Sequence, residues 1–208
     1  MELIRGLHNL RPRHRGCVAT LGNFDGVHRG HQAVIGQLAE QAVKLRLPAT
    51  VVIFEPQPRE YFLGADPVPP RLTRLREKLQ ALRQHSVERV LCLRFNQALA
   101  SLTPDEFIHR ILIDGLGVKA IVVGDDFRFG AKRAGDIDLL QRVGVQQGFV
   151  TVPIRDYAVD GERVSSTRVR AALARSDFDM VERLLGRPYR MCGRVAHGNK
   201  LGRTLGVP

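Results

Sequence analysis

The chain has 208 residues, of which 44% are hydrophobic, and it carries a formal net charge of +11 at pH 7. This length and apolar content predict one folded domain, or a domain and a fragment of another, and exclude a largely disordered chain. No run of about 18 apolar residues is present, so neither a transmembrane helix nor a membrane partner is expected. Residues 1–5 lack the apolar core of a signal peptide. The isolated cysteines Cys17, Cys92 and Cys192 argue against a disulfide framework or a zinc site and favour a cytoplasmic protein.

The basic residues are spread from Arg5 to Arg203 without a long basic block. A charge of this size is compatible with nucleic acid, an anionic membrane or a phosphorylated small molecule as a partner. Two interpretations are open at this point: a solvated basic surface, or a positive field focused around a phosphate site.

Short apolar runs that predict buried strands alternate with segments of helical periodicity from residue 17 to 152. They follow a basic segment, 1–15, which is interrupted by Pro12 and is expected at an edge of the fold. The predicted strands are 17–21, 50–54, 90–93, 120–123 and 149–152, and the predicted helices lie around 34–45, 72–82, 103–112 and 137–143. The alternation predicts an α/β fold, a Rossmann-like doubly wound parallel sheet with helices on both faces.

Local signals support the predicted helices. The first is expected to bury one face, formed by Val34, Ile35, Leu38, Ala42 and Leu45. Leucines at 3-4-3 spacing from Leu72 to Leu82 form a single apolar stripe on the second. The third begins at Thr103 as a cap, with a proline in the first turn and Glu106 placed for a capping box. Between the first two helices, a proline-rich segment from 55 to 71 is expected to be a loop, because proline lacks the N–H that a central strand needs.

Four unusual segments lie at the ends of the predicted strands. The loops 22–31, 54–62 and 124–130 each follow a strand directly, and 163–170 follows the last strand at a distance. In parallel sheets with helices on both faces, ligands bind beyond the carboxyl ends of the strands. The four segments together therefore predict a ligand site at this edge of the sheet.

The first loop, 22–31, contains three glycines and two histidines and leads into a helix. Free backbone N–H groups and the positive end of the dipole make a helix N-terminus an anion site, and glycines let a phosphate approach the backbone. His28 and His31 are three residues apart, so both can project from one side of the first helical turn. This loop predicts a phosphate-handling nucleotide site built around the two histidines.

Two later segments have both a plain and a functional interpretation. The loop 124–130 is either an ordinary turn with one phenylalanine in the core, or a loop that binds a planar ligand between aromatic faces. The segment 163–170 is either a simple serine N-cap, or a site where hydroxyls and helix N–H groups hold a triphosphate. In the second case Arg170 would bind phosphate as a bidentate fork and Arg163 would add a second positive charge.

These motifs resemble those of a known family. His28-Arg29-Gly30-His31 is similar to the HxGH signature of the nucleotidyltransferase superfamily, and Ser165–Arg170 is similar to its SSTxxR signature. Together with Gly22-Asn23-Phe24-Asp25-Gly26-Val27 and Gly124-Asp125-Asp126-Phe127-Arg128-Phe129-Gly130, they resemble the bacterial bifunctional riboflavin kinase/FAD synthetases. The resemblance covers essentially the whole chain, and the motifs in this order are highly specific.

The resemblance implies two modules. Residues 1–186 would form an FMN adenylyltransferase, which makes FAD and pyrophosphate from FMN and ATP. Residues 187–208 would form the start of a β-barrel riboflavin kinase module. The family continues past Pro208 with a Thr-Ala-Asn run that serves ATP and magnesium, so kinase activity is not expected from these residues alone. Whether the chain is a fragment, an engineered piece or a truncated gene product stays open, as does its oligomeric state.

The resemblance also implies roles for individual residues. An FMN phosphate oxygen would attack the α-phosphorus of ATP in line, with catalysis mostly by positioning and charge stabilisation. The implied catalytic residues are His28, His31 and Arg170, the histidines acting as donors that can be charged because their ordinary pKa is near neutrality. The implied ATP-binding residues are Gly22, Asn23, Phe24, Asp25, His28, His31, Gly124, Asp126, Arg163, Ser166, Thr167 and Arg170. The implied flavin-binding residues are Phe54, Pro56, Pro58, Phe62, Asp125 and Phe127.

Two of these assignments have a qualification. Asp126 stands where the family often has asparagine, and Asp25 has bracing of the turn as an alternative role. Magnesium is expected to arrive with ATP, because it bridges triphosphate oxygens and no metal site made by the protein alone is evident.

Three other functions compete with this interpretation. The first is adenylylation of another phosphorylated small molecule, such as pantetheine phosphate or a pyridine mononucleotide. The second is a basic nucleic-acid-binding module, but no aromatic-studded basic strand or recognition helix supports nucleic acid as a partner. The third is a catalytically idle flavin-binding remnant.

Overall fold

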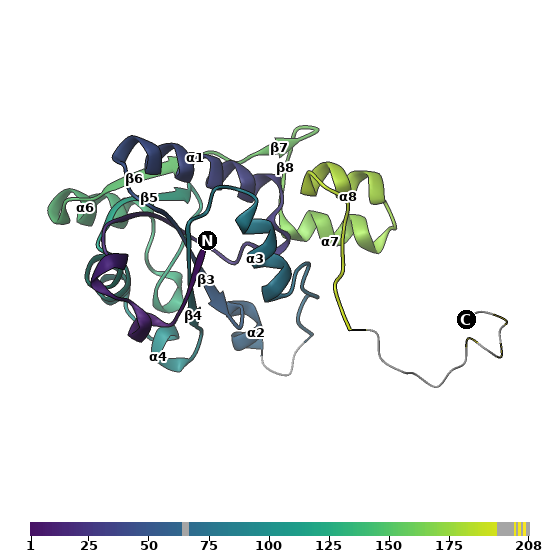
Figure 1. The fold of residues 1–208 in the computed structure, drawn as a ribbon, viewed down its shortest axis with the longest axis horizontal. Helices are drawn as coiled ribbons and strands as arrows, with labels where there is room; N and C mark the ends of the chain where they lie inside the picture. The colour runs from purple at the N-terminus through teal and green to yellow at the C-terminus, as the bar shows by residue number, and fades with distance from the viewer. Residues whose placement is uncertain (64–66, 195–201, 203, 205, 207–208) are drawn as a thin grey trace.

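The structure is a computed structural model that describes residues 1–63, 67–194, 202, 204 and 206. Its centre is a six-stranded sheet in the order β1-β4-β3-β2-β5-β6, with every neighbouring pair parallel (Figure 1). The strands are β1 (Glu2–Arg5), β2 (Cys17–Leu21), β3 (Ala49–Glu55), β4 (Arg89–Arg94), β5 (Val118–Gly124) and β6 (Val150–Ile154). The predicted parallel α/β sheet is confirmed, and the predicted edge segment contributes a sixth strand, which pairs with β4.

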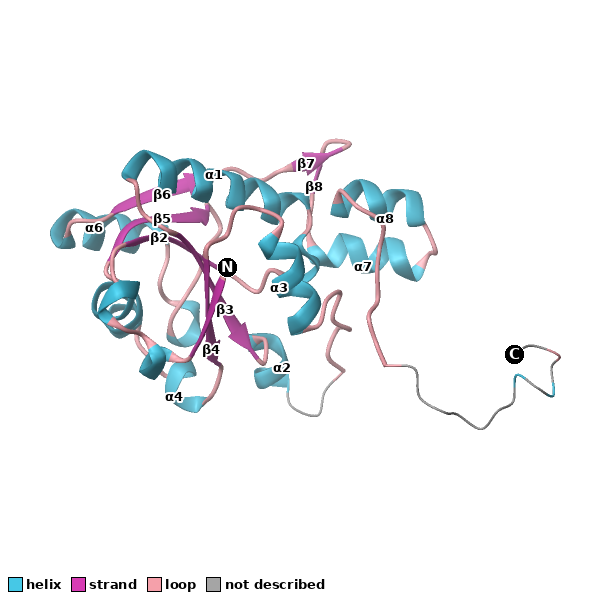
Figure 2. Cartoon of the chain, in the orientation of Figure 1, coloured by secondary structure: helices cyan, strands magenta, loops and turns pink. Residues whose placement is uncertain are grey.

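Helices surround this sheet (Figure 2). They are α1 (Arg29–Leu45), α2 (Pro58–Leu63), α3 (Leu75–Arg83), α4 (Gln97–Ala100), α5 (Pro104–Phe107), α6 (Ile137–Gln147), α7 (Ser166–Ala174) and α8 (Phe178–Leu185). A wider, π-type helical segment, Ile108–Leu116, continues α5. Short 3-10 turns occupy Leu7–Asn9, Pro12–His14, Asp25–Val27 and Ala131–Arg133. A small antiparallel hairpin, β7 (Ala158–Val159) and β8 (Glu162–Arg163), separates β6 from α7.

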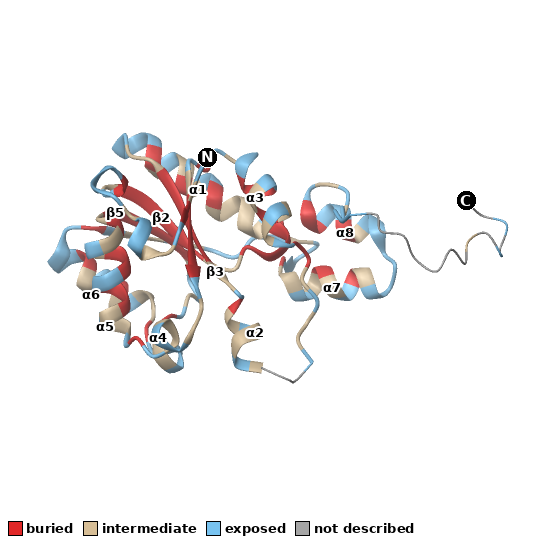
Figure 3. Cartoon of the chain, turned by 60° about the horizontal axis from the view of Figure 1, so that its bottom comes forward, coloured by how far each residue is buried: buried red, intermediate tan, exposed pale blue. Residues whose placement is uncertain are grey.

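Each face of the sheet is buried under a different set of helices (Figure 3). Alternate residues of β3 point to opposite faces, as a strand requires. Val51 packs in the cluster that contains Leu38 of α1 and Leu82 of α3. Its neighbour Val52 packs in the other cluster, which contains Ile108 and the α6 side chain Leu140. Both faces of the sheet are therefore buried from solvent, which explains the continuous apolar runs in the sequence.

The last two helices form a separate unit at one side of the sheet, where Figure 1 shows α7 and α8 together. They share a small apolar core that includes Val169, Leu184 and Leu185. Leu72 joins this core, although its spacing predicted the start of the second helix; α3 begins three residues later. The 67–74 segment thus links the sheet to α7 and α8.

Two local predictions need correction. Pro58–Leu63 is a helix and not a loop, because proline is favourable in a first helical turn and Glu60 accepts a hydrogen bond from the Gln57 N–H at 2.9 Å. Leu45 is 41% exposed, because it is the last residue of α1. The capping box at Thr103, in contrast, is confirmed.

Among the residues that the structure describes, no helix has the length and apolarity that crossing a bilayer requires. Of the predicted start of a second module, 187–208, residues 195–201, 203, 205, 207 and 208 lie outside the described residues.

Candidate active site

The turn between β2 and α1 has an unusual backbone. Phe24, Gly26 and Val27 have φ values of 47°, 82° and 43°. His28 then returns to extended backbone and is the N-cap of α1, with its Nδ1 accepting a hydrogen bond from the His31 N–H at 3.3 Å. Because Nδ1 accepts, the proton of the neutral ring lies on Nε2.

The two histidine rings are stacked, with centroids 3.7 Å apart and an interplanar angle of 14°. Burial is the main cause that lowers the pKa of His28 to about 4, although Asp25 opposes the shift. Burial, His28 and Lys78 hold the pKa of His31 well below its ordinary range. Both rings are therefore neutral at pH 7 without nucleotide. In this state His28 offers a neutral Nε2–H donor, and charged histidines beside a bound phosphate stay a prediction.

We expect the stability of the protein to fall as the pH is lowered from about 6.5 to 4. The pKa of His28 is about 4 in the folded state, against an ordinary value of 6.5 in the unfolded chain. Between these values the unfolded chain binds a proton that the folded state excludes, which removes roughly 3 kcal/mol of unfolding free energy. Urea denaturation at several pH values measures this slope. The variant His28→Asn is the control; an equal slope in the two proteins would contradict the assignment.

A cavity of about 220 Å³ opens beside the histidines at the carboxyl edge of the sheet. We call it the histidine cavity. The N-termini of two helices meet there, since His28 and His31 lie at the start of α1 and Ser165 and Ser166 at the start of α7. Two helix N-termini facing one cavity favour an anionic ligand with more than one charged group.

Arg163 forms one wall of the histidine cavity. Its guanidinium lies 2.7 Å from Asp126 and 2.9 Å from Asp156, and the hydrogen bond with Asp126 raises the pKa of the arginine. The arginine thereby offsets the negative charge that Asp126 brings to the cavity. This pairing lets an aspartate stand where the resemblance implies asparagine, without leaving a bare carboxylate beside phosphate.

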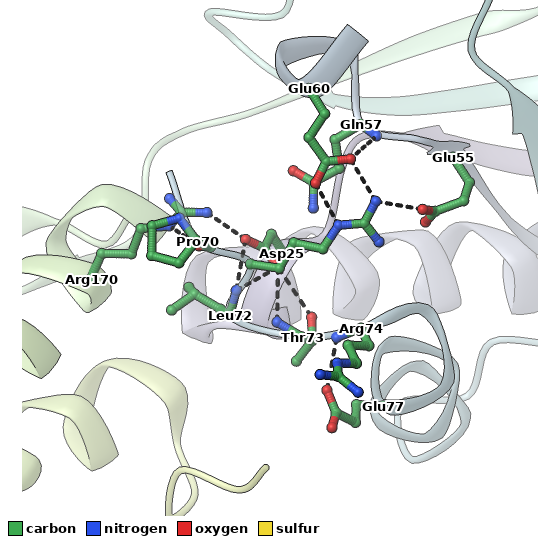
Figure 4. Close-up of polar contacts among 11 residues, drawn as sticks. Asp25, Glu55, Gln57, Glu60, Pro70, Leu72, Thr73, Arg74, Glu77 and Arg170 are labelled. Atoms are coloured by element: carbon green, nitrogen blue, oxygen red, sulfur yellow. Dashed lines mark hydrogen bonds and ion pairs between the residues drawn. The ribbon is translucent and has the colours of Figure 1, made fainter. Parts of the chain in front are cut away.

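Asp25 connects the turn between β2 and α1 to several other segments through hydrogen bonds and an ion pair (Figure 4). Asp25 as a residue is 2% exposed. Its carboxylate accepts hydrogen bonds from the backbone N–H groups of Leu72 and Thr73 at 3.0–3.1 Å, and from the Thr73 hydroxyl at 3.3 Å. Arg170 completes the set with an ion pair at 2.5 Å, and also donates to the Pro70 carbonyl at 2.7 Å. The Ser166 hydroxyl donates to the Asp25 carbonyl at 3.0 Å. Asp25 has the bracing role, and it connects the turn to α7.

A second cavity, of about 360 Å³, lies next to the first and has aromatic walls. We call it the aromatic cavity. Phe54 and Phe95 meet edge to face with centroids 5.9 Å apart, and Phe62 packs against Phe95 while remaining 68% exposed. On the other side, Phe127 stacks with Phe129 at 5.6 Å and 20°. Phe127 lines both cavities, so the two sites share a wall.

The structure brings together most of the residues that the sequence singled out. The histidine cavity is lined by Gly22, Phe24, His28, His31, Gly124, Asp126, Arg163 and Ser166, and the aromatic cavity by Phe54, Pro58, Phe62 and Phe127. Asn23, Asp25, Thr167 and Arg170 do not line the first cavity, and Pro56 and Asp125 do not line the second.

Sequence reasoning missed several lining residues. Phe95 directly follows β4 at the same carboxyl edge, and this position was the available signal. Phe129 lies within the predicted loop 124–130 but was not singled out. Asp156 and Tyr157 come from the segment before the hairpin, where no motif marked them.

A doubly wound parallel sheet with two helix N-termini lining a cavity at its carboxyl edge is the architecture of a nucleotidyltransferase-type protein. Comparison with protein-family models matches residues 10–168 to FAD synthetase and residues 185–208 to riboflavin kinase. The chain belongs to the FAD synthetase family.

Relatives over the full chain agree. A bifunctional riboflavin kinase/FMN adenylyltransferase of Pseudomonas fluorescens is 60% identical over 208 residues, and that of Escherichia coli (strain K12) is 51% identical over 209. In both cases the match covers 100% of this chain and 66% of the relative, so the chain spans just under two thirds of their length. A crystal structure from Streptococcus pneumoniae, named as a macrolide-efflux protein, has a TM-score of 0.84 at 29% identity, covering 100% of this chain and 67% of that one.

Proposed function

We propose that this chain is an FMN adenylyltransferase, which transfers AMP from ATP to FMN to give FAD and pyrophosphate. The observation that carries the proposal is the pair of adjoining cavities: one has two helix N-termini and stacked histidines, the other has aromatic walls, and Phe127 belongs to both. A triphosphate and a planar ring system are the ligands that suit these two environments. Family membership and the names of the relatives support the same reaction.

The chemical step needs one bond to form and one to break. An oxygen of the FMN phosphate attacks the α-phosphorus of ATP, and the bond from that phosphorus to the bridging oxygen breaks, so pyrophosphate leaves with the electron pair. Negative charge grows on the transferred group and on the leaving group. His28 would donate its Nε2–H to a phosphate oxygen as this charge develops, which requires no proton transfer.

The neighbouring groups would hold the triphosphate. The first turns of α1 and α7 line the cavity, so their unpaired backbone N–H groups would donate to phosphate, and Ser166 and Thr167 would add hydroxyls at the start of α7. Arg163 would supply positive charge from the wall. Arg170 uses the N–H of Nε for Pro70 and one N–H of Nη2 for Asp25, so the two N–H groups of Nη1 and the second of Nη2 have no partner among the described contacts.

Magnesium would enter with the nucleotide. Within the described part of the chain, no group of three or more His, Cys, Asp or Glu side chains could hold a metal ion. The acidic side chains nearest the histidine cavity, Asp126 and Asp156, are already paired with Arg163. Phosphate oxygens would therefore be the main ligands of Mg²⁺, whose chemistry is to offset triphosphate charge.

We further propose that the adenylyltransferase unit spans residues 1–186 and that a riboflavin kinase segment begins at 187. The support is the end of α8 at Leu185 and the separate match of residues 185–208 to the riboflavin kinase model. The proposed reaction here is adenylyl transfer alone.

Incubation of the chain with ATP, FMN and Mg²⁺ is expected to form FAD and pyrophosphate in equal amounts. Chromatography with flavin fluorescence detects FAD, and a coupled assay detects pyrophosphate. Parallel reactions with pantetheine phosphate and with nicotinamide mononucleotide separate the other adenylyltransferases. Pyrophosphate release with one of those acceptors and not with FMN would contradict the proposal. Salt-sensitive duplex binding without any FMN-dependent pyrophosphate release would favour a nucleic-acid-binding module instead.

A further inference from the structure

The turn that carries His28 requires support from outside itself. Val27 is fully buried and has a φ of 43°, which is rare for a β-branched residue. A backbone of this kind costs on the order of 1–3 kcal/mol and persists only when its surroundings fix it. The position of His28 therefore depends on the groups that hold Gly26 and Val27.

Two side chains hold the carbonyl groups of this turn. Arg187 donates to the Gly26 carbonyl at 2.6 Å and to the Val27 carbonyl at 3.1 Å. Gln32 of α1 donates to the same Val27 carbonyl at 2.9 Å. Both also reach the Leu185 carbonyl at the end of α8, at 3.3 Å and 2.7 Å respectively. The planar guanidinium can bind two adjacent carbonyls at fixed geometry, which a lysine ammonium cannot reproduce.

Gly186 makes this contact possible. It has a φ of 70°, and a Cβ there would come within 3.3 Å of Arg29 and Gln32 side-chain atoms. The chain can thus leave α8, turn sharply and place the next residue, Arg187, against the turn.

Arg187 lies outside the residues matched to FAD synthetase and inside those matched to riboflavin kinase. We infer that Arg187 is a positioning residue for adenylyl transfer, fixing the Gly26–Val27 turn so that the His28 Nε2–H points at the reacting phosphate. The segment that follows α8 therefore completes the nucleotide site. This inference rests on the proposed function.

The test is to replace Arg187 in the full 208-residue chain. Arg187→Ala and Arg187→Lys are both expected to lower kcat for FAD formation about tenfold or more, since small misplacement of a catalytic group has a large effect. The KM for ATP should change less than about threefold, because the hydrogen bond from His28 to the phosphate, which the variants misplace, acts mainly in the transition state. Arg187→Lys preserves the charge and most of the aliphatic side chain. It therefore tests the paired hydrogen bonds of the guanidinium to the Gly26 and Val27 carbonyls, even where Arg187→Ala fails to fold. Arg190→Ala is the matched control, since Arg190 is exposed in the same segment.

A nuclear magnetic resonance measurement separates positioning from a general loss of stability. Long-range ¹H–¹⁵N spectra are expected to show His28 as the Nε2–H tautomer in the wild type. In the folded Arg187 variants they should show mixed tautomers and a pKa nearer 6.5. Folded variants with wild-type kcat, or with lowered kcat and an unchanged His28 tautomer, would overturn the inference. Absence of FAD synthesis by the wild type would instead remove the proposed function, so the two failures are distinguishable.

Discussion

Replacement of His28 by alanine is expected to lower kcat for FAD formation by roughly 10²-fold or more, the effect of removing one preorganised donor from a phosphate or oxyanion site. Three observations support this size. His28 is buried, its Nδ1 is committed to the His31 N–H, and its Nε2–H is the donor that remains. A donor held in this way needs little reorganisation when charge develops on the phosphate.

Two variants make this test specific. His28→Asn keeps an N-cap acceptor for the first turn of α1 but lacks the Nε2–H, so it should retain the thermal stability of the wild type and still lose activity. His109→Ala removes an exposed histidine far along the chain and should leave kcat unchanged. Steady-state pyrophosphate release gives kcat for His28→Ala, His28→Asn and His109→Ala. Turnover within threefold of wild type in a folded His28→Asn protein would remove His28 from the catalytic residues.

Replacement of Asp25 by alanine is expected to destabilise the fold by about 3–5 kcal/mol, the cost of leaving a buried charge without its partner. The carboxylate accepts hydrogen bonds from Leu72 and Thr73 and pairs with Arg170, whose side chain is only 19% exposed. Removal of the Asp25 carboxylate therefore eliminates the hydrogen bonds that join the turn to the 67–74 segment and the ion pair that joins it to α7. Urea denaturation at pH 7 gives the change in unfolding free energy.

A double-mutant cycle with Arg170→Ala tests whether the ion pair is the cause. The double variant should be less destabilised than the sum of the single variants, because removing both partners leaves no unpaired charge. Asp114→Ala is the control: it removes an exposed aspartate from the helical segment before β5 and should change stability by less than about 0.5 kcal/mol. Additive effects at Asp25 and Arg170 would show that the pair is not coupled.

Much of the fold was predictable because its signals are local. Apolar runs and helical periodicity lie within single segments, and the cap at Thr103 is complete within four residues. The meeting of 22–31 with 124–130 and 163–170 was also predictable. Parallel strands place their carboxyl ends at one edge, so loops far apart in sequence converge there.

Some features had a local signal that was overlooked. Asp160-Gly161 has φ values of 55° and 75° and turns the β7–β8 hairpin, and Asp-Gly is a strong hairpin signal. Pro58 and Glu60 begin a helix, but the density of prolines around them favoured a loop.

Other features have no local signal. The low pKa of His28 depends first on burial, and Arg163 and Arg170, from a distant part of the sequence, lower it further. The pairing of Arg170 with Asp25 joins positions 145 residues apart. The motif predicts an arginine at the start of α7, but only the folded structure shows which of its N–H groups already donate to Asp25 and Pro70.

Phe127 lines both cavities, so ligands bound in the two cavities at the same time would share it as a contact. A nucleotide that displaced this side chain would change the shape offered to a flavin, and a flavin that fixed it would change the shape offered to a nucleotide. Thermodynamic linkage makes the two effects equal in free energy, whichever ligand binds first. An inhibitor of one cavity that contacted Phe127 is therefore expected to alter binding in the other cavity, with an apparent affinity that depends on the concentration of the second ligand.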